Sequence, residues 1–356
     1  SGTVENCNFT NNHAEYDGGA IRMSSGSVTN CNFTGNKATG SNSWGGAILF
    51  AGKGSVTNCN FTNNTATNGN GGAIYFYYGS TGTVTNCNFT NNSARYGGAI
   101  YFEYGSTGNV TNCNFSGNTA DGDGGAVYFN NYGNVTNCNF TNNKATGSNS
   151  WGGAVYMYFG SVTNCNFTDN EAYYGGAIRF DGEGNVTNCN FSDNTATNGN
   201  GGAIEMFSGS VENCNFTANT ATRYGGAVYF QNTGTVSNCN FTANQASRGG
   251  AVYFLDGGKV ENCNFTGNNA TTGSAIYFYK YYSTDTLTIS NSTFLNNRAN
   301  AEALEVTKNE NNITITFTGN DNLLNAIYSR NGAEVTFTNV TYWGANGITT
   351  VSATMS

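Results

Sequence analysis

The sequence predicts an all-β protein: a right-handed, single-stranded parallel β-helix of about 13 coils, with three short strands in each coil. Two observations predict this fold. The tetrapeptide Asn-Cys-Asn-Phe recurs along the chain, and its cysteines stand 24 to 28 residues apart. After a variable stretch, most copies are followed by Gly-Gly-Ala-Ile or Gly-Gly-Ala-Val. A fixed period of this length indicates one structural unit that stacks on itself.

The second repeat shows how the first two strands are assigned. Side chains of a strand alternate between its two faces. Val28 stands at an even position and Cys31 and Phe33 at odd positions, so these apolar residues share one face only if the alternation shifts by one residue at Asn30. A bend at Asn30 in the left-handed conformation returns both halves to the interior. We therefore expect one strand at Val28 and a second strand through Cys31 and Phe33. Asn36 is expected to form the next corner.

The third strand is expected at the Gly-Gly-Ala segment. Ile48 and Phe50 have the parity of inward residues, and the residue between them points the other way. Arg22, Tyr128 and Glu205 occupy this middle position in other coils, so we expect it to face solvent. A leucine-rich or all-helical solenoid is the competing fold. Runs dense in Gly and Asn, without a 3.6-residue period, argue against it.

Composition and length limit the other readings. Residues 1–280 are predicted to form the regular coils, and residues 281–356 the degenerate C-terminal coils and cap of the same domain. The net charge is -8 with few basic residues, which argues against a nucleic-acid partner. We find no transmembrane-length apolar run and no secretory signal. The chain begins within a repeat, so we interpret it as a trimmed segment of something longer, or as a subunit whose end a neighbour covers.

The repeat resembles that of known surface proteins. Phe-x-x-Asn followed by Gly-Gly-Ala, as in Phe61-Thr62-Asn63-Asn64 with Gly71-Gly72-Ala73-Ile74, resembles the repeat of the chlamydial polymorphic outer membrane proteins. It is more similar to the repeat of adhesin-like surface proteins of methanogenic archaea. The resemblance covers about residues 3–280. It implies a right-handed β-helix that is secreted, displayed at the cell surface and used in adhesion.

The cysteines are expected to form an inward column of free thiols. The alternatives are a metal site, a redox ladder or disulfides. Zinc sites favour paired spacings such as Cys-x-x-Cys, which this chain lacks. Residues on stacked coils also lie slightly too far apart for disulfides. The column comprises Cys7, Cys31, Cys59, Cys87, Cys113, Cys138, Cys165, Cys189, Cys214, Cys239 and Cys263.

Tyrosines at the outward middle position of the third strand are the main candidates for interaction with other molecules. Exposed rings could stack on sugars or pack against another protein. The alternative is aromatic stacking between coils of the same chain. These residues are Tyr75, Tyr101, Tyr128, Tyr156, Tyr229, Tyr253 and Tyr277.

Asparagines and aspartates supply further candidates. The Asn that precedes Phe in each Cys-Asn-Phe segment is expected to face outward in a hydrogen-bonded amide ladder. The alternative is sparse N-glycosylation at Asn91, Asn269 or Asn339, which stand in Asn-x-Ser/Thr triplets. Asp169 and Asp193 share a register on adjacent coils and are a candidate cation site, although two carboxylates alone bind calcium weakly.

The pattern favours a function without catalysis or a cofactor. Pectate lyases and polygalacturonases share this fold class, but such chemistry needs clustered carboxylates with a base nearby. Here the outward faces carry mostly Thr, Asn and Tyr, and the one histidine, His13, lies in a loop. We expect an extracellular adhesin-like protein that binds surface glycans or other cell-surface proteins. The alternatives are a self-assembling subunit of a filament or sheath and, less favoured, a polysaccharide lyase or hydrolase.

Overall fold

One coil shows how the sequence makes the fold. Val127–Thr136 forms β20, Asn139–Thr141 forms β21 and Lys144–Ala145 forms β22. In the next coil, β20 pairs in parallel with β23 (Val155–Thr163), and β21 with β24 (Asn166–Thr168). Each residue therefore lies beside its equivalent one repeat later. The result is a parallel β-solenoid with three strands per coil, as the period predicts.

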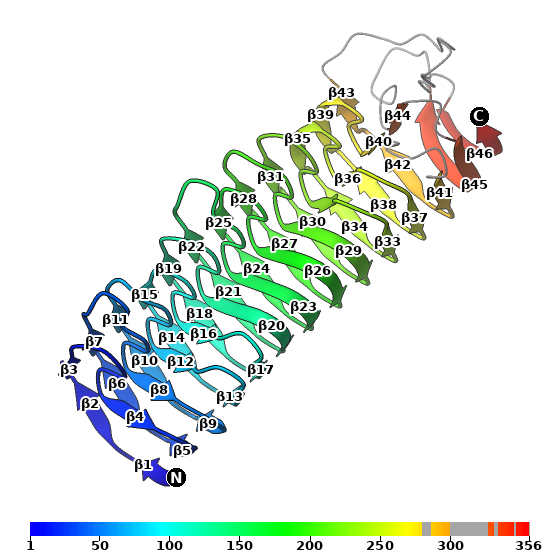
Figure 1. Cartoon of the computed structure of the whole chain (residues 1–356). Coiled ribbons are helices and arrows are strands. Elements are labelled where there is room, and N and C mark those ends of the chain that lie inside the picture. The colour runs from blue at the N-terminus through cyan, green and yellow to red at the C-terminus, as the bar shows by residue number, and fades with distance from the viewer. Residues whose placement is uncertain (280–285, 300–326, 331–333, 345–346, 356) are drawn as a thin grey trace. The chain divides into compact units, whose positions relative to one another are not determined.

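The computed structural model describes residues 1–279, 286–299, 327–330, 334–344 and 347–355, with side chains for residues 1–279 and 286–298. Its internal contacts divide the chain into two units, Ser1–Gly182 (unit 1) and Glu183–Ser356 (unit 2). The described residues of both units form strands and turns, with no helix that could cross a membrane (Figure 1).

The strand with the sequence Asn-Phe-Thr or Asn-Phe-Ser is the most regular element. Its copies in unit 1 are β2 (Asn8–Thr10), β6 (Asn32–Thr34), β10 (Asn60–Thr62), β14 (Asn88–Thr90), β18 (Asn114–Ser116), β21 and β24. In unit 2 they are β27 (Asn190–Ser192), β30 (Asn215–Thr217), β34 (Asn240–Thr242) and β38 (Asn264–Thr266). β42 (Thr293–Leu295) takes the same place in the next coil with the sequence Thr-Phe-Leu.

The other two strands differ somewhat from expectation. In several coils a turn divides the long strand, as between β12 (Ile74–Phe76) and β13 (Thr81–Thr85). In β20 and β23 the two parts are continuous, so two of the expected strands become one. The two-residue strand represented by β22 was not predicted, because two residues are too few to show a period.

Apolar side chains fill the interior of each coil. Val110, Cys113, Phe115 and Phe129 are at most 1% exposed. The phenylalanine rings of the Asn-Phe-Thr strands stack face to face along unit 1, with centroids 4.8 Å apart between Phe89 and Phe115. Burial of each such large side chain stabilises the fold by about 1.5–3 kcal/mol.

The corners are made by residues in the left-handed conformation. Asn30 has φ 53°, as the slipped alternation predicts. The prediction of the next corner at Asn36 is wrong by one residue: Gly35 occupies it with φ 66°, and Asn36 is fully buried. Since a corner residue turns the chain, the residue after it points inward.

The buried asparagines form a ladder that sequence reasoning missed. Asn118 donates from its backbone N–H and its Nδ2 to Asn143 Oδ1, each at 3.0 Å. Its Nδ2 also donates to the Phe89 carbonyl oxygen at 3.0 Å, and its Oδ1 accepts the backbone and side-chain N–H groups of Asn92. The side-chain amide therefore joins three coils. In unit 1 this ladder comprises Asn36, Asn64, Asn92, Asn118, Asn143 and Asn170.

The Gly-Gly pair is explained by two separate constraints. Gly97 has φ 60°, which glycine adopts without strain. Gly98 lies against the next coil, where a Cβ would be 2.0 Å from the carbonyl oxygen of Gly125. No side chain fits there, so the second glycine sets how closely the coils stack.

The parallel pairing of unit 2 continues beyond residue 280. β41 (Thr286–Ser290) pairs in parallel with both β37 (Gly258–Glu261) and β45 (Glu334–Gly344). β46 (Gly347–Met355) then pairs with β45 in the antiparallel sense. The last described strands therefore depart from the parallel coil pattern (Figure 1).

Candidate functional site

The tyrosines of the third strand are not exposed, so the prediction that they face solvent is wrong. Their rings do point away from the interior, but other side chains cover them. Tyr128 is half-buried. The other six are 1–7% exposed: Tyr75, Tyr101, Tyr156, Tyr229, Tyr253 and Tyr277.

Stacking and loop side chains account for this burial. Tyr101 and Tyr128 stack with ring centroids 4.7 Å apart. Trp44, from the loop of the preceding coil, stacks on Tyr75 with ring centroids 5.4 Å apart. In unit 2, Tyr224 covers Tyr253 at 4.8 Å. Burial also raises the pKa of Tyr101. The column therefore packs within the chain, as the alternative reading held.

A different set of aromatic side chains is exposed in unit 1. It lies one to three residues beyond the last inward residue of the third strand, on four consecutive coils. We call it the aromatic turn row. It comprises Tyr77 and Tyr78, which follow β12, Tyr104, which follows β16 (Ile100–Phe102), Tyr132 in β20, and Tyr158 and Phe159 in β23.

The members of the aromatic turn row are 39–63% exposed. Tyr78 and Tyr104 stack with centroids 6.0 Å apart, and Tyr132 is the parallel partner of Phe159. Among the described residues, only Tyr16 and Phe207 outside the row are large apolar side chains of similar exposure. Sequence reasoning missed the row, although aromatics recurring in the turn after each third strand were a visible signal.

Unit 1 also has a cavity between the loops of three consecutive coils, which we call the loop cavity. It encloses about 530 Å³. Its functional side chains are Arg95 and Tyr96 from the first loop, Asp121 and Asp123 from the second, and Trp151 from the third. Gly122, Gly147, Ser148, Asn149 and Ser150 complete the lining.

Asp123 is the most constrained polar group of the loop cavity. Its Oδ1 accepts the backbone N–H of Trp151 at 2.9 Å. Burial raises the pKa of Asp123 to about 6, and the nearby carboxylate of Asp181 acts in the same direction. Arg95 lies over the ring of Tyr96, 5.3 Å from its centroid. The cavity thus combines a partly buried acid, a guanidinium and two aromatic side chains.

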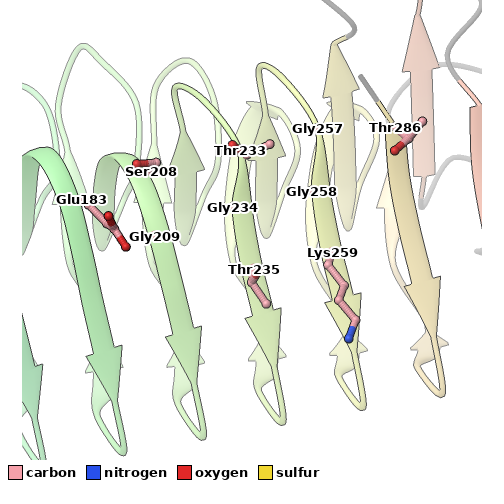
Figure 2. Close-up of a pocket in the computed structure, with 10 residues that line it drawn as sticks. All are labelled: Glu183, Ser208, Gly209, Thr233, Gly234, Thr235, Gly257, Gly258, Lys259 and Thr286. Atoms are coloured by element: carbon pink, nitrogen blue, oxygen red, sulfur yellow. The ribbon is translucent and has the colours of Figure 1, made fainter. Parts of the chain in front are cut away.

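Unit 2 has a groove of about 540 Å³ with a plainer lining. Figure 2 shows the side chains of Glu183, Ser208, Thr233 and Thr286 on successive coils, with Lys259 lying along its strand. The remaining lining residues are Gly209, Gly234, Thr235, Gly257 and Gly258. Small hydroxyls and backbone predominate, so this groove has fewer distinctive recognition groups than the loop cavity.

The cysteine thiols lie in one column within each unit, and none forms a disulfide. Ten are buried, from Cys31 to Cys263, whereas Cys7 is exposed. The Cys113 thiol accepts the backbone N–H of Cys87 at 3.4 Å and donates to the Thr111 carbonyl oxygen at 3.2 Å. The hydrogen bond to Cys113, together with burial, raises the pKa of Cys87 to about 12. The Cys87 thiol is therefore a weak nucleophile, because its thiolate is disfavoured.

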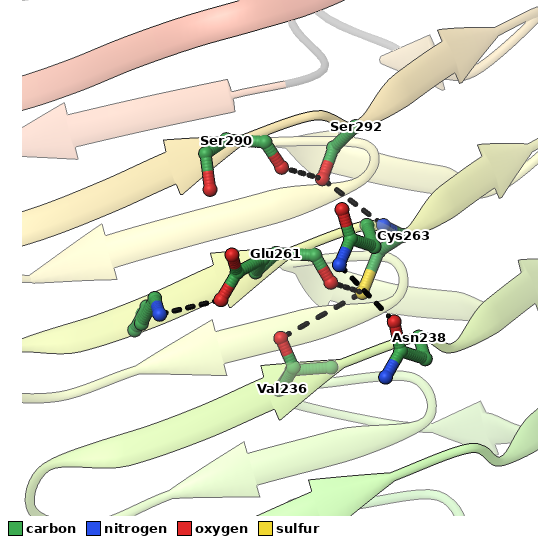
Figure 3. Close-up of polar contacts among 8 residues, drawn as sticks. Val236, Asn238, Glu261, Cys263, Ser290 and Ser292 are labelled. Atoms are coloured by element: carbon green, nitrogen blue, oxygen red, sulfur yellow. Dashed lines mark hydrogen bonds and ion pairs between the residues drawn. The ribbon is translucent and has the colours of Figure 1, made fainter.

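A serine replaces the thiol at the twelfth position of the column. Cys263 donates to the carbonyl oxygens of Glu261 and Val236 at 3.2 and 3.7 Å (Figure 3). Its backbone N–H donates to the Ser292 hydroxyl at 3.1 Å, and that hydroxyl donates to the Ser290 carbonyl oxygen at 2.8 Å. The hydroxyl makes the same contacts as a thiol.

The candidate glycosylation sites lie in different surroundings. Asn91 is exposed at a left-handed corner, with φ 53°. Asn269 is half-buried in β39 (Asn269–Thr272), and its Oδ1 is buried. Asn339 lies in β45, and its side chain is outside the described part of the chain. The Asn before each Phe faces outward in an amide ladder, in which Asn114 Nδ2 donates to Asn88 Oδ1 at 2.9 Å.

The two candidate cation ligands are corner residues of separate units. Asp169 in unit 1 has φ 54°, and Asp193 in unit 2 has φ 57°. Within the described residues, no group of three or more His, Cys, Asp or Glu side chains could hold a metal ion. Each aspartate takes the corner place that Asn142 takes in an earlier coil.

Comparison with protein families agrees with this architecture. A family model for the right-handed β-helix region matches residues 1–161 and 176–353. Comparisons with curated proteins and with solved structures gave no match. The two matched segments cover most of the sequence and are separated by a short gap. The loop cavity and the aromatic turn row both lie within the first segment. The chain belongs to the right-handed β-helix family.

Proposed function

We propose that this protein is a non-enzymatic extracellular surface protein that binds glycans through the aromatic turn row. The observation that supports this most is the exposure of six aromatic side chains, 39–63% each, just beyond the last inward residue of the third strand on four consecutive coils. Exposed aromatic patches mark binding surfaces. A tyrosine ring covers the apolar face of a sugar, and its hydroxyl exchanges hydrogen bonds with the sugar hydroxyls.

The geometry of the row suits an extended chain better than a single small molecule. Coils of a β-solenoid repeat every ~4.8 Å, so equivalent rings recur at a short, regular interval. Tyr78 and Tyr104 keep a stacked arrangement, with 27° between their planes. A polysaccharide could therefore contact several rings at once, and the weak contacts would add.

A lack of catalysis is part of the same proposal. Among the ion pairs of the described residues, Arg179 with Asp181 is largely buried, and Asp181 also accepts the Tyr156 hydroxyl at 2.9 Å. Asp181 follows Phe180 as Tyr158 follows Met157, so it lies beside the end of the row, but its carboxylate is engaged by Arg179 and by the Tyr156 hydroxyl. The row itself presents phenol hydroxyls, which suit binding rather than acid–base chemistry at neutral pH.

The test is retention of purified protein on a panel of immobilised polysaccharides. The double variant Tyr78→Ser, Tyr104→Ser removes the two most exposed rings of the row, which are 62% and 63% exposed. We expect at least a roughly tenfold loss of affinity, as for the loss of two good contacts. Tyr16→Ser is the matched control, because Tyr16 is 59% exposed but lies outside the row. Binding that is equal in all three proteins, or absent from every polysaccharide, contradicts the proposal.

A second candidate is self-association of the same row into a filament or sheath. The observation that favours it is the apolar character of the row, since such patches also bury against protein. Sedimentation of the wild-type protein without glycan tests it. Assembly that is lost in the Tyr78→Ser, Tyr104→Ser variant would assign the row to a protein interface instead.

A further inference from the structure

We propose that the loop cavity of unit 1 is a second, separate binding site, for a single pyranose residue that carries no carboxylate. The site does not depend on the aromatic turn row, and it stands even if the row binds nothing. The cavity encloses about 530 Å³, within the 300–1,000 Å³ range of small-ligand pockets.

The aromatic walls of the cavity are fixed before any ligand arrives. Tyr96 meets Tyr128 edge to face, with centroids 5.8 Å apart. Gly122 lies so close to Tyr96 that an added Cβ would be 2.4 Å from a ring carbon. Trp151 has the guanidinium of Arg179 over its ring, 5.4 Å from the centroid. Rings held in this way lose little entropy on binding.

The polar groups match the hydroxyls of a sugar. Asp123 Oδ1 is occupied by the Trp151 backbone N–H, whereas its Oδ2 receives no hydrogen bond from the described residues. Arg95 presents donor groups from the opposing loop, and Ser148 and Asn149 supply exposed side chains from the third. A carboxylate acceptor with a guanidinium donor suits neighbouring hydroxyls, because charge-assisted hydrogen bonds are the stronger kind.

The charge of the lining selects against acidic sugars. Two carboxylates, Asp121 and Asp123, line the cavity with one cation, Arg95, and the nearby Arg179 is paired with the carboxylate of Asp181. A hexuronate would bring a third carboxylate into the same cavity, where like charges repel. A neutral hexose or an amino sugar meets no such penalty. The ligand class is therefore a pyranose without a carboxylate.

The loop that supplies Trp151 recurs at Trp44, and an acid stands beside both copies: Asp17 precedes Gly18 as Asp123 precedes Gly124. Their contacts differ, because Asp17 pairs with Arg22. Gly40-Ser41-Asn42-Ser43-Trp44 repeats the sequence of Gly147-Ser148-Asn149-Ser150-Trp151. The Trp44 backbone N–H donates to the Tyr16 carbonyl oxygen at 3.0 Å, whereas the Trp151 N–H donates to the Asp123 carboxylate. The tryptophan loop alone is thus a structural feature, and the hydrogen bond from the Trp151 N–H to the Asp123 carboxylate distinguishes the second copy.

Binding of free methyl glycosides, followed by ligand-observed NMR, tests the proposal. We expect at least one neutral methyl hexoside to bind the wild-type protein with a Kd on the order of 1 mM, and glucuronic acid at least roughly tenfold more weakly. Asp123→Asn is expected to weaken hexoside binding roughly tenfold, because it removes a charged acceptor. Asp169→Asn makes the same charge change at a corner and should bind like wild type.

Three results would overturn the proposal. The first is no binding of any neutral or amino hexoside at tens of millimolar, on the scale of very weak complexes. The second is unchanged binding by Asp123→Asn, a variant that keeps an acceptor for the Trp151 N–H and so retains the loop. The third is loss of hexoside binding in the Tyr78→Ser, Tyr104→Ser variant. Since that variant alters only the aromatic turn row, failure of the row and failure of the cavity are separable.

Discussion

The buried and outward asparagine ladders allow a direct comparison of the same contact in two environments. Asn118 and Asn114 stand four residues apart in one coil, and both exchange side-chain amide hydrogen bonds with the coils on either side. Asn118 is fully buried, whereas Asn114 is exposed. We predict that alanine at Asn118 destabilises the protein severely and that alanine at Asn114 scarcely affects it.

The magnitude follows from the groups that each substitution leaves without a partner. Asn118→Ala removes the acceptor of two hydrogen bonds, so the backbone N–H of Asn92 and one of its Nδ2 hydrogens are left without a partner. It also removes the donor to the Phe89 carbonyl oxygen. All three groups lie in the interior. Each buried polar group left unsatisfied costs about 1–3 kcal/mol. For these three groups the expected loss is therefore roughly 3–9 kcal/mol. At Asn114 water replaces the lost partners, and we expect less than about 1 kcal/mol.

Urea unfolding followed by circular dichroism measures both effects. Because a solenoid can open locally, amide hydrogen exchange around residues 89–145 should accompany it. Faster exchange confined to these coils in Asn118→Ala would agree with the account. Equal losses in the two variants, or a loss under about 1 kcal/mol at Asn118, would refute the assignment of this ladder to a dry interior.

Three further predictions follow from other parts of the structure. Gly98→Ala places a Cβ 2.0 Å from the Gly125 carbonyl oxygen, so we expect the free energy of unfolding in urea to fall by more than about 2 kcal/mol. The control is Gly79→Asn, because a Cβ at Gly79 meets nothing within 4 Å and its φ is 68°. Its free energy of unfolding should stay within about 1 kcal/mol of the wild type. Cys113→Ser should cost less than about 2 kcal/mol in thermal unfolding, since Ser292 already takes a place in the thiol column; complete loss of folding would contradict this. Burial raises the pKa of the Asp123 carboxyl from 3.8 to about 6. The protonated carboxyl therefore contributes its full stability to the fold below the pKa of the unfolded chain, and this contribution is lost as the pH rises through about 6. The whole shift corresponds to roughly 3 kcal/mol in the free energy of unfolding. The Asp123→Asn variant should therefore gain stability over wild type at about pH 7.5 and lose that advantage near pH 4; urea midpoints that differ equally at both pH values would exclude the shift.

The sequence determined the coil more completely than its surface. Cys31 and Phe33 point inward because alternation about a left-handed Asn30 leaves no other arrangement, and every repeat carries the same pattern. Asn36 was misplaced because asparagine serves equally well as a corner and as a ladder residue. The signal that separates them is variation: the true corner holds Gly35, Asn63 or Ala218, whereas the ladder place remains asparagine.

The surface could not be predicted because the variable loops decide it. The alternation of the strand places Tyr75 on the outer face, and it does lie there. Trp44 covers it, however, and comes from a variable loop that the repeat does not predict. The loop cavity depends on Asp123 and Arg95, whose residue types occur at these places in only a few coils, as at Asp17 and Arg223. No period relates such residues to one another, so their convergence appears only when the loops are seen together in space.

Native-state alkylation read by mass spectrometry tests the central claim, that copies of one coil stack in register around a dry interior. The account predicts that an excess of iodoacetamide labels Cys7, which is exposed, and leaves the ten cysteines from Cys31 to Cys263 unlabelled until denaturant is added. Rapid labelling of several thiols in the middle of the column, in protein that remains folded, would contradict it.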